Sequence, residues 1–291
     1  MALSVSKSDK NQNFENREFA MSEADFQKIK TFIYDRAGIS LSDQKRGLVY
    51  ARLTRRLRDL GLTTFKAYLD YLAEGQDNQE FSNLVNALTT NHTKFFRERH
   101  HFDFLRGTAA AQWRKQLTRG APSKIRIWSA GCSTGEEPYT IAMTMAHAFD
   151  LDFDWKILAT DIDTTVLSHA KRGQYSVDTA RDIPAQVKHR YMRSLGQDLI
   201  EVDKQLQSHI RFNRLNLHGN WPMKGPFDAI FCRNVTIYFD PPTKNKLIQR
   251  FIQLLPPGGF LFLGHSETLA SRDLDLEPLG RTVYQRPMKG G

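Results

Sequence analysis

From residue 125 onwards, the chain alternates short apolar segments with longer segments whose apolar residues recur at helical spacing. Strands are expected at 125–129, 155–160, 210–216, 227–232 and 259–264, and helices at 136–149, 163–171 and 242–255 among others. This alternation is typical of α/β folds, because a parallel strand is reached through a crossover connection that a helix usually supplies. The sequence therefore predicts a mostly parallel, doubly wound sheet with helices on both faces.

The first part of the chain is organised differently. Residues 1–20 are polar and carry too few apolar side chains to fold alone, so we expect a disordered tail there. A helix is predicted to begin after Ser22 and to end at Gly38, and helical patterns also cover 43–60, 65–73 and 80–88. These patterns predict the following division: a helical domain at 21–90, a linker and connecting helix at 91–120, and the α/β domain at 121–291, with a small β subdomain inserted at about 174–209.

Composition narrows the class of protein. The net charge of +9 indicates an acidic partner, which could be nucleic acid, a membrane surface or an acidic protein. No apolar segment is long enough to cross a membrane, and the polar N-terminus does not resemble a signal peptide, so we expect a cytoplasmic protein without membrane insertion. Cys132 and Cys232 lack the spacing of a zinc site or a disulfide framework, and no metal site is predicted.

Candidate ligand-binding residues follow the predicted strands. The turn at 129–139 is rich in small residues and leads into a helix, but it matches neither the Gly-x-Gly-x-x-Gly fingerprint nor a P-loop, which disfavours a pyrophosphate ligand. Glu136 and Glu137 could accept hydrogen bonds from amino or hydroxyl groups, or could simply complement the helix dipole. Asp161, after the second strand, is placed where nucleotide-binding folds bind ribose hydroxyls, whereas Asp163 is expected to cap the next helix.

Five short motifs, in this order along the chain, together resemble one known family. They are Asn91-His92-Thr93-Lys94-Phe95-Phe96-Arg97-Glu98, Ser133-Thr134-Gly135-Glu136-Glu137-Pro138-Tyr139, Asp161-Ile162-Asp163, Cys232-Arg233-Asn234-Val235-Thr236-Ile237-Tyr238-Phe239 and Gly264-His265-Ser266-Glu267. The chain resembles the chemotaxis protein methyltransferases of the CheR family from about Ser22 to its C-terminus. The resemblance implies a Rossmann-like S-adenosylmethionine-dependent methyltransferase domain, an N-terminal all-helical domain and a small inserted β subdomain.

The resemblance also implies a reaction and a set of site residues. The cofactor would be S-adenosyl-L-methionine, with S-adenosyl-L-homocysteine as product, and the substrate would be glutamate side chains on the cytoplasmic helical bundle of chemotaxis receptors, methylated to adjust signalling during adaptation. Arg97 and Tyr238 would place the acceptor carboxylate. The family's cofactor contacts correspond here to Asn91, Thr93, Arg97, Glu137, Asp161, Asn216, Leu217, Arg233 and Asn234.

The implied chemistry agrees with the lack of an obvious catalytic dyad. A carboxylate is already ionised at neutral pH, so an attacking glutamate needs no general base. Adjacent side chains such as His265, Ser266 and Glu267 diverge and cannot form a triad by being neighbours in sequence. Holding the reactants in line and excluding water should supply most of the acceleration.

Basic residues are concentrated in the second predicted helix. The run could be an ordinary solvated face, but with the family resemblance we expect it to dock onto an acidic receptor helix. We expect the protein to act as a monomer that binds no nucleic acid. The docking candidates are Arg52, Arg55, Arg56 and Arg58.

Two other functions remain open from the sequence. A nucleic-acid methyltransferase is suggested by the net charge and by Asp240-Pro241-Pro242, but this tripeptide is followed by Thr243 rather than an aromatic residue, and it is better placed to start a helix. A module that binds cofactor or receptor without turnover is the second alternative. The presence of the residues that the resemblance implies for the site argues against it: Arg97, Asp161, Arg233, Asn234 and Tyr238.

Overall fold

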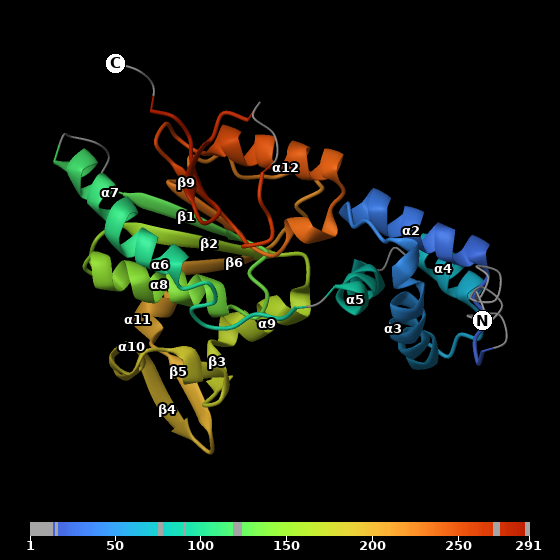
Figure 1. Cartoon of the computed structure of the whole chain (residues 1–291). Helices are drawn as coiled ribbons and strands as arrows, with labels where there is room; N and C mark the ends of the chain where they lie inside the picture. The colour runs from blue at the N-terminus through green and yellow to red at the C-terminus, as the bar shows by residue number, and fades with distance from the viewer. Residues whose placement is uncertain are drawn as a thin grey trace, which may run out of the picture. The chain divides into compact units, whose positions relative to one another are not determined.

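The computed structural model describes residues 14, 17–74, 78–89, 91–118, 124–269 and 274–288. The chain divides into two compact units, Met1–Thr90 and Asn91–Gly291 (Figure 1). Most of the predicted tail, 1–20, lies outside the described residues. Its described end contacts the first unit: Phe19 is buried, and the backbone N–H of Phe19 donates to the hydroxyl of Tyr50.

The first unit is helical throughout its described part, as the sequence predicted. The side chain of Ser22 accepts a hydrogen bond from the backbone N–H of Asp25, and the carboxylate of Asp25 accepts one from the backbone N–H of Ser22. Gly38 ends the same helix in the left-handed conformation with φ of 72°. These are the cap and the stop that were read from the sequence. The helices are α2 (Glu23–Ala37), the 3-10 turn η1 (Asp43–Lys45), α3 (Arg46–Asp59), α4 (Phe65–Glu74) and α5 (Asn78–Leu88).

A buried polar network joins three of these helices. Glu80 of α5 is almost fully buried and accepts hydrogen bonds from Nε and Nη2 of Arg56, at 3.1 and 2.6 Å, and from the hydroxyl of Tyr68, at 2.8 Å. Burial alone would raise the pKa of Glu80, but the hydrogen bonds from Arg56, Asn83 and Tyr68 bring that pKa below its usual value. The buried charge is therefore compensated within the unit.

We expect Tyr68→Phe to lower the free energy of unfolding by about 1 kcal/mol, because Glu80 loses one hydrogen bond while its contacts with Arg56 remain. Chemical denaturation of the full chain, followed by circular dichroism, measures the change. Tyr71→Phe is the matched control, since Tyr71 lies on the same helix and is exposed. Equal losses in the two variants would contradict the assigned role of the network.

The second unit is an α/β fold, as predicted. Its large sheet has seven strands among the described residues, in the order β6-β2-β1-β7-β8-β10-β9. The five strands from β6 to β8 are parallel to their neighbours. The elements are β1 (Ile125–Ala130), α8 (Glu136–Ala148), β2 (Trp155–Asp161), α9 (Thr164–Arg172), β6 (Ile210–Arg214), β7 (Ala229–Cys232), α12 (Pro241–Leu254), β8 (Phe260–Leu263), β9 (Glu277–Gly280) and β10 (Val283–Gln285).

The last two strands were not predicted. β10 pairs with β8 in the antiparallel direction, and β9 pairs with β10 at the edge of the sheet. All four residues of β9 are exposed, and β10 is three residues long. Neither segment carries the apolar pattern by which a strand is recognised.

Helices cover both faces of the sheet. Ile127 packs with Trp113 and with residues of α8 in one core, whereas the adjacent Trp128 packs with Phe251 of α12 in the other. Neighbouring residues of a strand point to opposite faces, so one strand contributes to both cores. Figure 1 shows α8 and α12 on opposite sides of the sheet. The connecting segment before β1 is α6 (His100–Phe104), the π-helical turn η2 (Leu105–Ala109) and α7 (Ala110–Leu117).

A small antiparallel sheet, in the order β3-β5-β4, is inserted between α9 and β6. This sheet is the small inserted β subdomain that the sequence predicted. No helix in the described part of the chain is both long and apolar enough to cross a bilayer. The inserted elements are β3 (Gln174–Ser176), the 3-10 turn η3 (Thr179–Asp182), α10 (Ala185–Tyr191), β4 (Met192–Gly196), β5 (Leu199–Val202) and α11 (Lys204–Gln207).

Candidate active site

Four parallel strands, in the order β6-β2-β1-β7, have their carboxyl ends along the same edge of the large sheet. The residues that follow them are therefore neighbours in space although they are far apart in sequence. The small-residue turn follows β1, Asp161 ends β2, and Arg233 follows β7 directly. Asn216 comes shortly after β6. This edge is where the sequence motifs meet.

The turn after β1 depends on glycine. Gly131 and Gly135 have φ of 90° and 100°, values that side chains with a Cβ atom rarely adopt. A Cβ atom at Gly131 would also lie only 2.4 Å from Cγ2 of Val235, in the loop after β7. The backbone N–H of Gly131 donates to the carbonyl of Thr160 at 2.8 Å, which ties the turn to β2. At these two positions the turn therefore presents backbone without a side chain.

Asp161 is a half-buried carboxylate beside this turn. Its Oδ2 accepts the backbone N–H of Ser133 at 2.8 Å, and its Oδ1 accepts that of Asp163 at 3.0 Å. Burial raises the pKa of Asp161 to about 6, against the effect of these two backbone hydrogen bonds. Each carboxylate oxygen can accept more than one hydrogen bond, so Asp161 can still receive hydroxyl donors.

Asn91 reaches the same corner of the sheet. The side-chain Nδ2 of Asn91 donates to Oδ2 of Asp163 at 3.2 Å, and the backbone carbonyl of Asn91 accepts the hydroxyl of Ser133 at 3.2 Å. Asp163 also accepts the backbone N–H of Thr165, at 2.7 Å, which confirms its predicted role as the N-cap of α9. Thr93, the next predicted contact along the segment, is half-buried.

Arg233 is a buried cation that contacts the segment carrying Arg97. Its Nη1 donates to Oε2 of Glu137 at 3.1 Å, its Nη2 lies 3.4 Å from Oε2 of Glu98, and Nη2 also donates to the carbonyl of Arg97. The other oxygen of Glu137 accepts the hydroxyl of Ser129 at 2.7 Å. Burial raises the pKa of Glu137, and Arg233 opposes that rise.

This network changes how two of the predicted cofactor contacts are understood. Each oxygen of Glu137 already has a protein partner, and the guanidinium of Arg233 points inward to two carboxylates. The family resemblance implied that both residues contact the cofactor, and that contact stays a prediction. In the structure Arg233 also donates to the backbone carbonyl of Arg97, and Glu137 pairs with Arg233.

Arg97 itself is half-buried, and its Nη1 donates to the carbonyl of His92 at 2.8 Å. The residues on either side of it, Phe96 and Glu98, have φ of 53° and 56°. Non-glycine residues adopt this left-handed conformation only when surrounding contacts hold them there. The backbone at Arg97 is thus fixed on both sides, and Arg233 holds its carbonyl.

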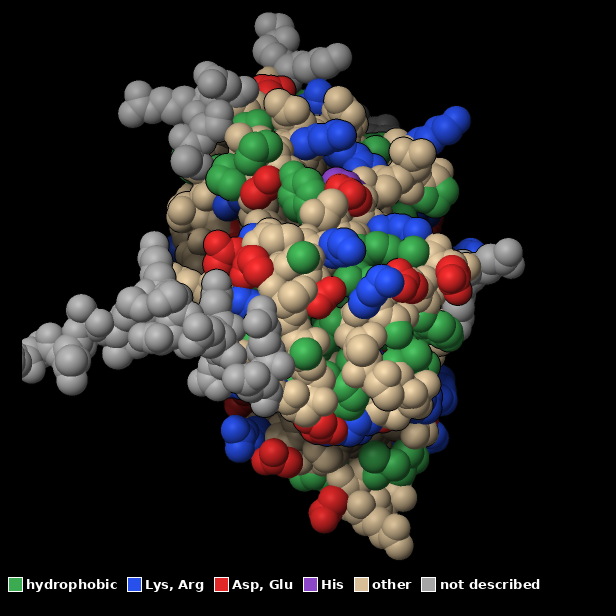
Figure 2. All heavy atoms as spheres, turned by 90° about the vertical axis from the view of Figure 1, so that its right-hand side faces the viewer, with side chains coloured by type: hydrophobic (Ala, Val, Ile, Leu, Met, Phe, Trp, Pro, Cys, Tyr) green, Lys and Arg blue, Asp and Glu red, His purple; other side chains and the backbone are tan. Residues whose placement is uncertain are grey.

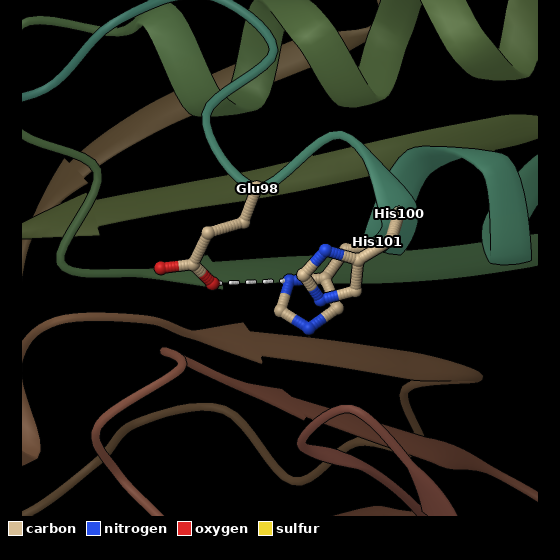
Figure 3. A group of neighbouring side chains, drawn as sticks. All are labelled: Glu98, His100 and His101. Carbon is tan, nitrogen blue, oxygen red and sulfur yellow. Dashed lines mark ion pairs between the residues drawn. The ribbon is translucent and has the colours of Figure 1, made fainter.

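Glu98, His100 and His101 form a group whose ligand atoms lie within 4.8 Å of one another (Figure 3). Oε2 of Glu98 lies 3.5 Å from Nδ1 of His101, and its Oε1 lies 3.0 Å from Nδ1 of His265. Burial lowers the pKa of His101 to about 3, so this ring is neutral. The positive charge that faces Oε2 of Glu98 comes from Arg233, which makes the group part of the ion-pair network. Glu98 stands in the first motif but was not predicted as a site residue.

The remaining predicted residues follow β6 and β7. Asn216 is half-buried, and Leu217 is buried with its side chain in the core on the α12 side. Asn234 follows Arg233 with φ of 61°, and the half-buried Tyr238 ends the 3-10 turn η4 (Thr236–Tyr238). Both belong to the loop between β7 and α12.

Two of the four arginines predicted to dock a receptor are engaged inside the first unit. Arg52 donates to the carbonyls of Ala87 and Thr89, at 3.0 and 2.9 Å, and so closes the C-terminal end of α5. Arg56 pairs with the buried Glu80. Helical spacing could not reveal these partners, because they lie on another helix.

The other two arginines are exposed. Arg58 pairs with the exposed Glu18, and Arg55 is exposed on α3. In the visible part of the face drawn in Figure 2, Lys and Arg side chains are interspersed with Asp and Glu. Arg55 and Arg58 are thus the two predicted docking residues whose side chains are exposed.

Family models match both units of the chain. Residues 91–285 match the model described as CheR methyltransferase, SAM binding domain, and residues 24–89 match the model described as CheR methyltransferase, all-alpha domain. The two matches together cover most of the chain.

Curated relatives match over nearly their whole length. The chain is 45% identical over 270 residues to the chemotaxis protein methyltransferase of Escherichia coli K12, covering 91% of each protein. It is 44% identical over 276 residues to chemotaxis protein methyltransferase 2 of Pseudomonas aeruginosa, covering 93% of this chain and 96% of the relative. Against the chemotaxis protein methyltransferase of Borreliella burgdorferi, identity is 38% over 280 residues, with 95% and 99% covered.

Proposed function

The chain belongs to the CheR family of S-adenosylmethionine-dependent methyltransferases, and on that premise we propose that it forms methyl esters on glutamate side chains of chemotaxis receptors. The observation that supports this proposal best is the meeting of the family's motifs at one edge of the sheet. There the segment of Asn91 contacts the turn after β1, and that turn contacts Asp161. The substrate would be the cytoplasmic helical bundle of the receptor.

The residues at this edge fit an adenosyl ligand. Asp161 offers a carboxylate with capacity for a ribose hydroxyl pair, and the glycine turn allows close approach of the ligand to the backbone. Asn91 contacts the turn after β1, and Asn234 lies in the loop after β7, at the same edge of the sheet. Bound S-adenosylmethionine supplies a methyl group activated by a sulfonium. The acceptor carboxylate needs no general base, so the protein has only to orient it and exclude water.

Arg97 is the residue that we propose to orient the acceptor. A guanidinium can hold a carboxylate by hydrogen bonds while one oxygen stays available for attack. Its backbone is fixed by Arg233, and its side chain is anchored at the carbonyl of His92. Tyr238, on the loop after β7, is proposed to contact the same acceptor.

Methyl transfer is tested directly with radiolabelled S-adenosylmethionine and a cytoplasmic receptor fragment. We expect label on the receptor that is released as methanol by base, as an ester requires. The control is a receptor fragment whose acceptor glutamates are replaced by alanine. A protein that binds S-adenosylhomocysteine but labels no receptor would favour the binding-only alternative. Inhibition by competing nucleic acid at moderate salt would favour a nucleic-acid substrate.

We expect Arg55→Glu to raise KM for the receptor fragment about tenfold, because an acidic receptor surface would meet a repulsive charge. The affinity for S-adenosylhomocysteine should not change. Lys66→Glu, the same charge reversal at an exposed residue of α4, is the control. Equal effects of the two substitutions would indicate attraction by net charge, without a docking site on α3.

A further inference from the structure

Glu267 is a buried carboxylate in the turn after β8, and only 1% of its surface is exposed. A buried acidic group is costly unless its oxygens are satisfied. Here Oε2 accepts the backbone N–H groups of Asn234 and Gly264, both at 2.6 Å. Oε1 accepts the hydroxyl of Thr236 at 2.8 Å and the backbone N–H of Ile237 at 3.2 Å. The carboxylate is therefore satisfied by four hydrogen bonds.

Three of these four donors belong to the loop between β7 and α12. Asn234, the second residue of the loop, has φ of 61°, a conformation that a non-glycine residue adopts only when surrounding contacts hold it there. Thr236 and Ile237 lie in the turn η4, which ends at Tyr238. Glu267 thus holds the backbone of the loop that carries Asn234, a proposed cofactor contact, and Tyr238, a proposed acceptor contact.

The loop between β7 and α12 is closely packed on two sides. A Cβ atom at Gly264 would lie 2.6 Å from Nδ2 of Asn234 and 2.6 Å from Oε2 of Glu267. On the other side, the turn after β1 approaches Val235 so closely that Gly131 could not carry a Cβ atom. The loop is packed between two glycine turns, and the four hydrogen bonds select one position for it.

We infer that Glu267 is a positioning residue for methyl transfer. Its carboxylate holds the loop of residues 233–239 so that Asn234 faces the cofactor and Tyr238 faces the acceptor. This role rests on the proposed function, because it assumes that these two residues act in the reaction. Glu267 has no part in bond making, since its oxygens face the backbone of the loop.

The chemistry of the four donors requires an acceptor with two oxygens. Glutamine has the same shape, but it would direct an NH₂ group at a backbone N–H whichever way the amide is turned. At Oε2 it would face two backbone N–H groups, and at Oε1 it would face Thr236, which can rotate, and Ile237, which cannot. Glu267→Gln therefore disturbs the loop with little change in volume.

The experiment measures kcat, KM for a receptor fragment and the Kd for S-adenosylhomocysteine in the full chain, well below its unfolding temperature. For Glu267→Gln we expect kcat to fall about 10- to 100-fold, since a small misplacement of reacting groups has effects of that size. The Kd should rise only a few-fold, because Asp161 and the turn after β1 are unchanged. Glu277→Gln, at an exposed residue of β9, is the control and should match the wild type.

Gly264→Ala serves as the second variant, because its methyl group would push on the same loop while the carboxylate stays in place. We expect it to lower kcat as Glu267→Gln does, with one molecule of S-adenosylhomocysteine still bound per chain. Wild-type kcat and KM in a folded Glu267→Gln protein would overturn the inference. Activity that falls only in proportion to the folded fraction would also overturn it. A wild-type protein that labels no receptor would refute the proposed function itself.

Discussion

Asp161→Ala is expected to weaken the binding of S-adenosylhomocysteine about 100-fold. Two ribose hydroxyl groups would each lose a hydrogen bond to a charged acceptor, and each such bond contributes about 1.5 kcal/mol. The same substitution removes the acceptor for the backbone N–H groups of Ser133 and Asp163, which loosens the turn beside it. Isothermal titration calorimetry of the full chain measures the change.

The affinity of the wild type should also depend on pH. Burial raises the pKa of Asp161 to about 6 in the free protein. Hydroxyl donors bind the ionised carboxylate, so bound ligand lowers that pKa. The affinity is then highest above pH 6 and falls as the pH drops through 6, by up to about tenfold per pH unit. In Asp161→Ala this part of the pH dependence should disappear.

Asp152→Ala is the control for the binding experiment. Asp152 is an exposed aspartate that precedes β2, at the opposite end of the strand from Asp161. It should bind the ligand as the wild type does, at every pH. Unchanged affinity in Asp161→Ala would refute the ribose assignment.

Arg97→Lys is expected to lower kcat about 100-fold, an effect typical for the loss of a group that stabilises the arrangement in the transition state. Lysine keeps the charge but lacks the planar guanidinium that can bind a carboxylate with two parallel hydrogen bonds. The Kd for S-adenosylhomocysteine should change much less than kcat. Single-turnover labelling of the receptor fragment measures the rate of methyl transfer separately from the binding of S-adenosylhomocysteine.

Arg99→Lys tests whether the effect is specific to Arg97. Arg99 is an exposed arginine in the same segment, close enough in sequence to report a general disturbance of the linker. It should label the receptor at the wild-type rate. A kcat in Arg97→Lys that equals that of Arg99→Lys would remove Arg97 from the mechanism.

Local sequence chemistry explains why much of the fold could be predicted. Apolar periodicity located the five parallel strands from β6 to β8. Ser22, Gly38 and Asp163 marked helix ends by hydrogen bonds within a few residues of themselves. Asp240 likewise caps α12, with Pro241 in its first turn, as predicted. The strands β9 and β10 escaped prediction because pairing with β8, rather than an apolar pattern, makes them strands.

The candidate site was predicted in part for a similar reason. Carboxyl ends of parallel strands share an edge, so the order of strands and motifs was enough to place Asp161 and the glycine turn together. The partners of charged side chains were beyond such reasoning. Arg56 meets Glu80 across 24 positions of sequence, and Arg233 meets Glu137 across 96.

The sequence by itself thus determined the α/β architecture, the helix caps and the edge of the sheet at which the family's motifs lie. These depend on spacing and on contacts between near neighbours. Only the tertiary structure decided which partners each buried charged residue has. That choice depends on long-range pairing, because a buried charge must find an opposite charge or several hydrogen bonds wherever the fold brings them. Glu137, Arg233 and Glu267 are buried and paired for this reason.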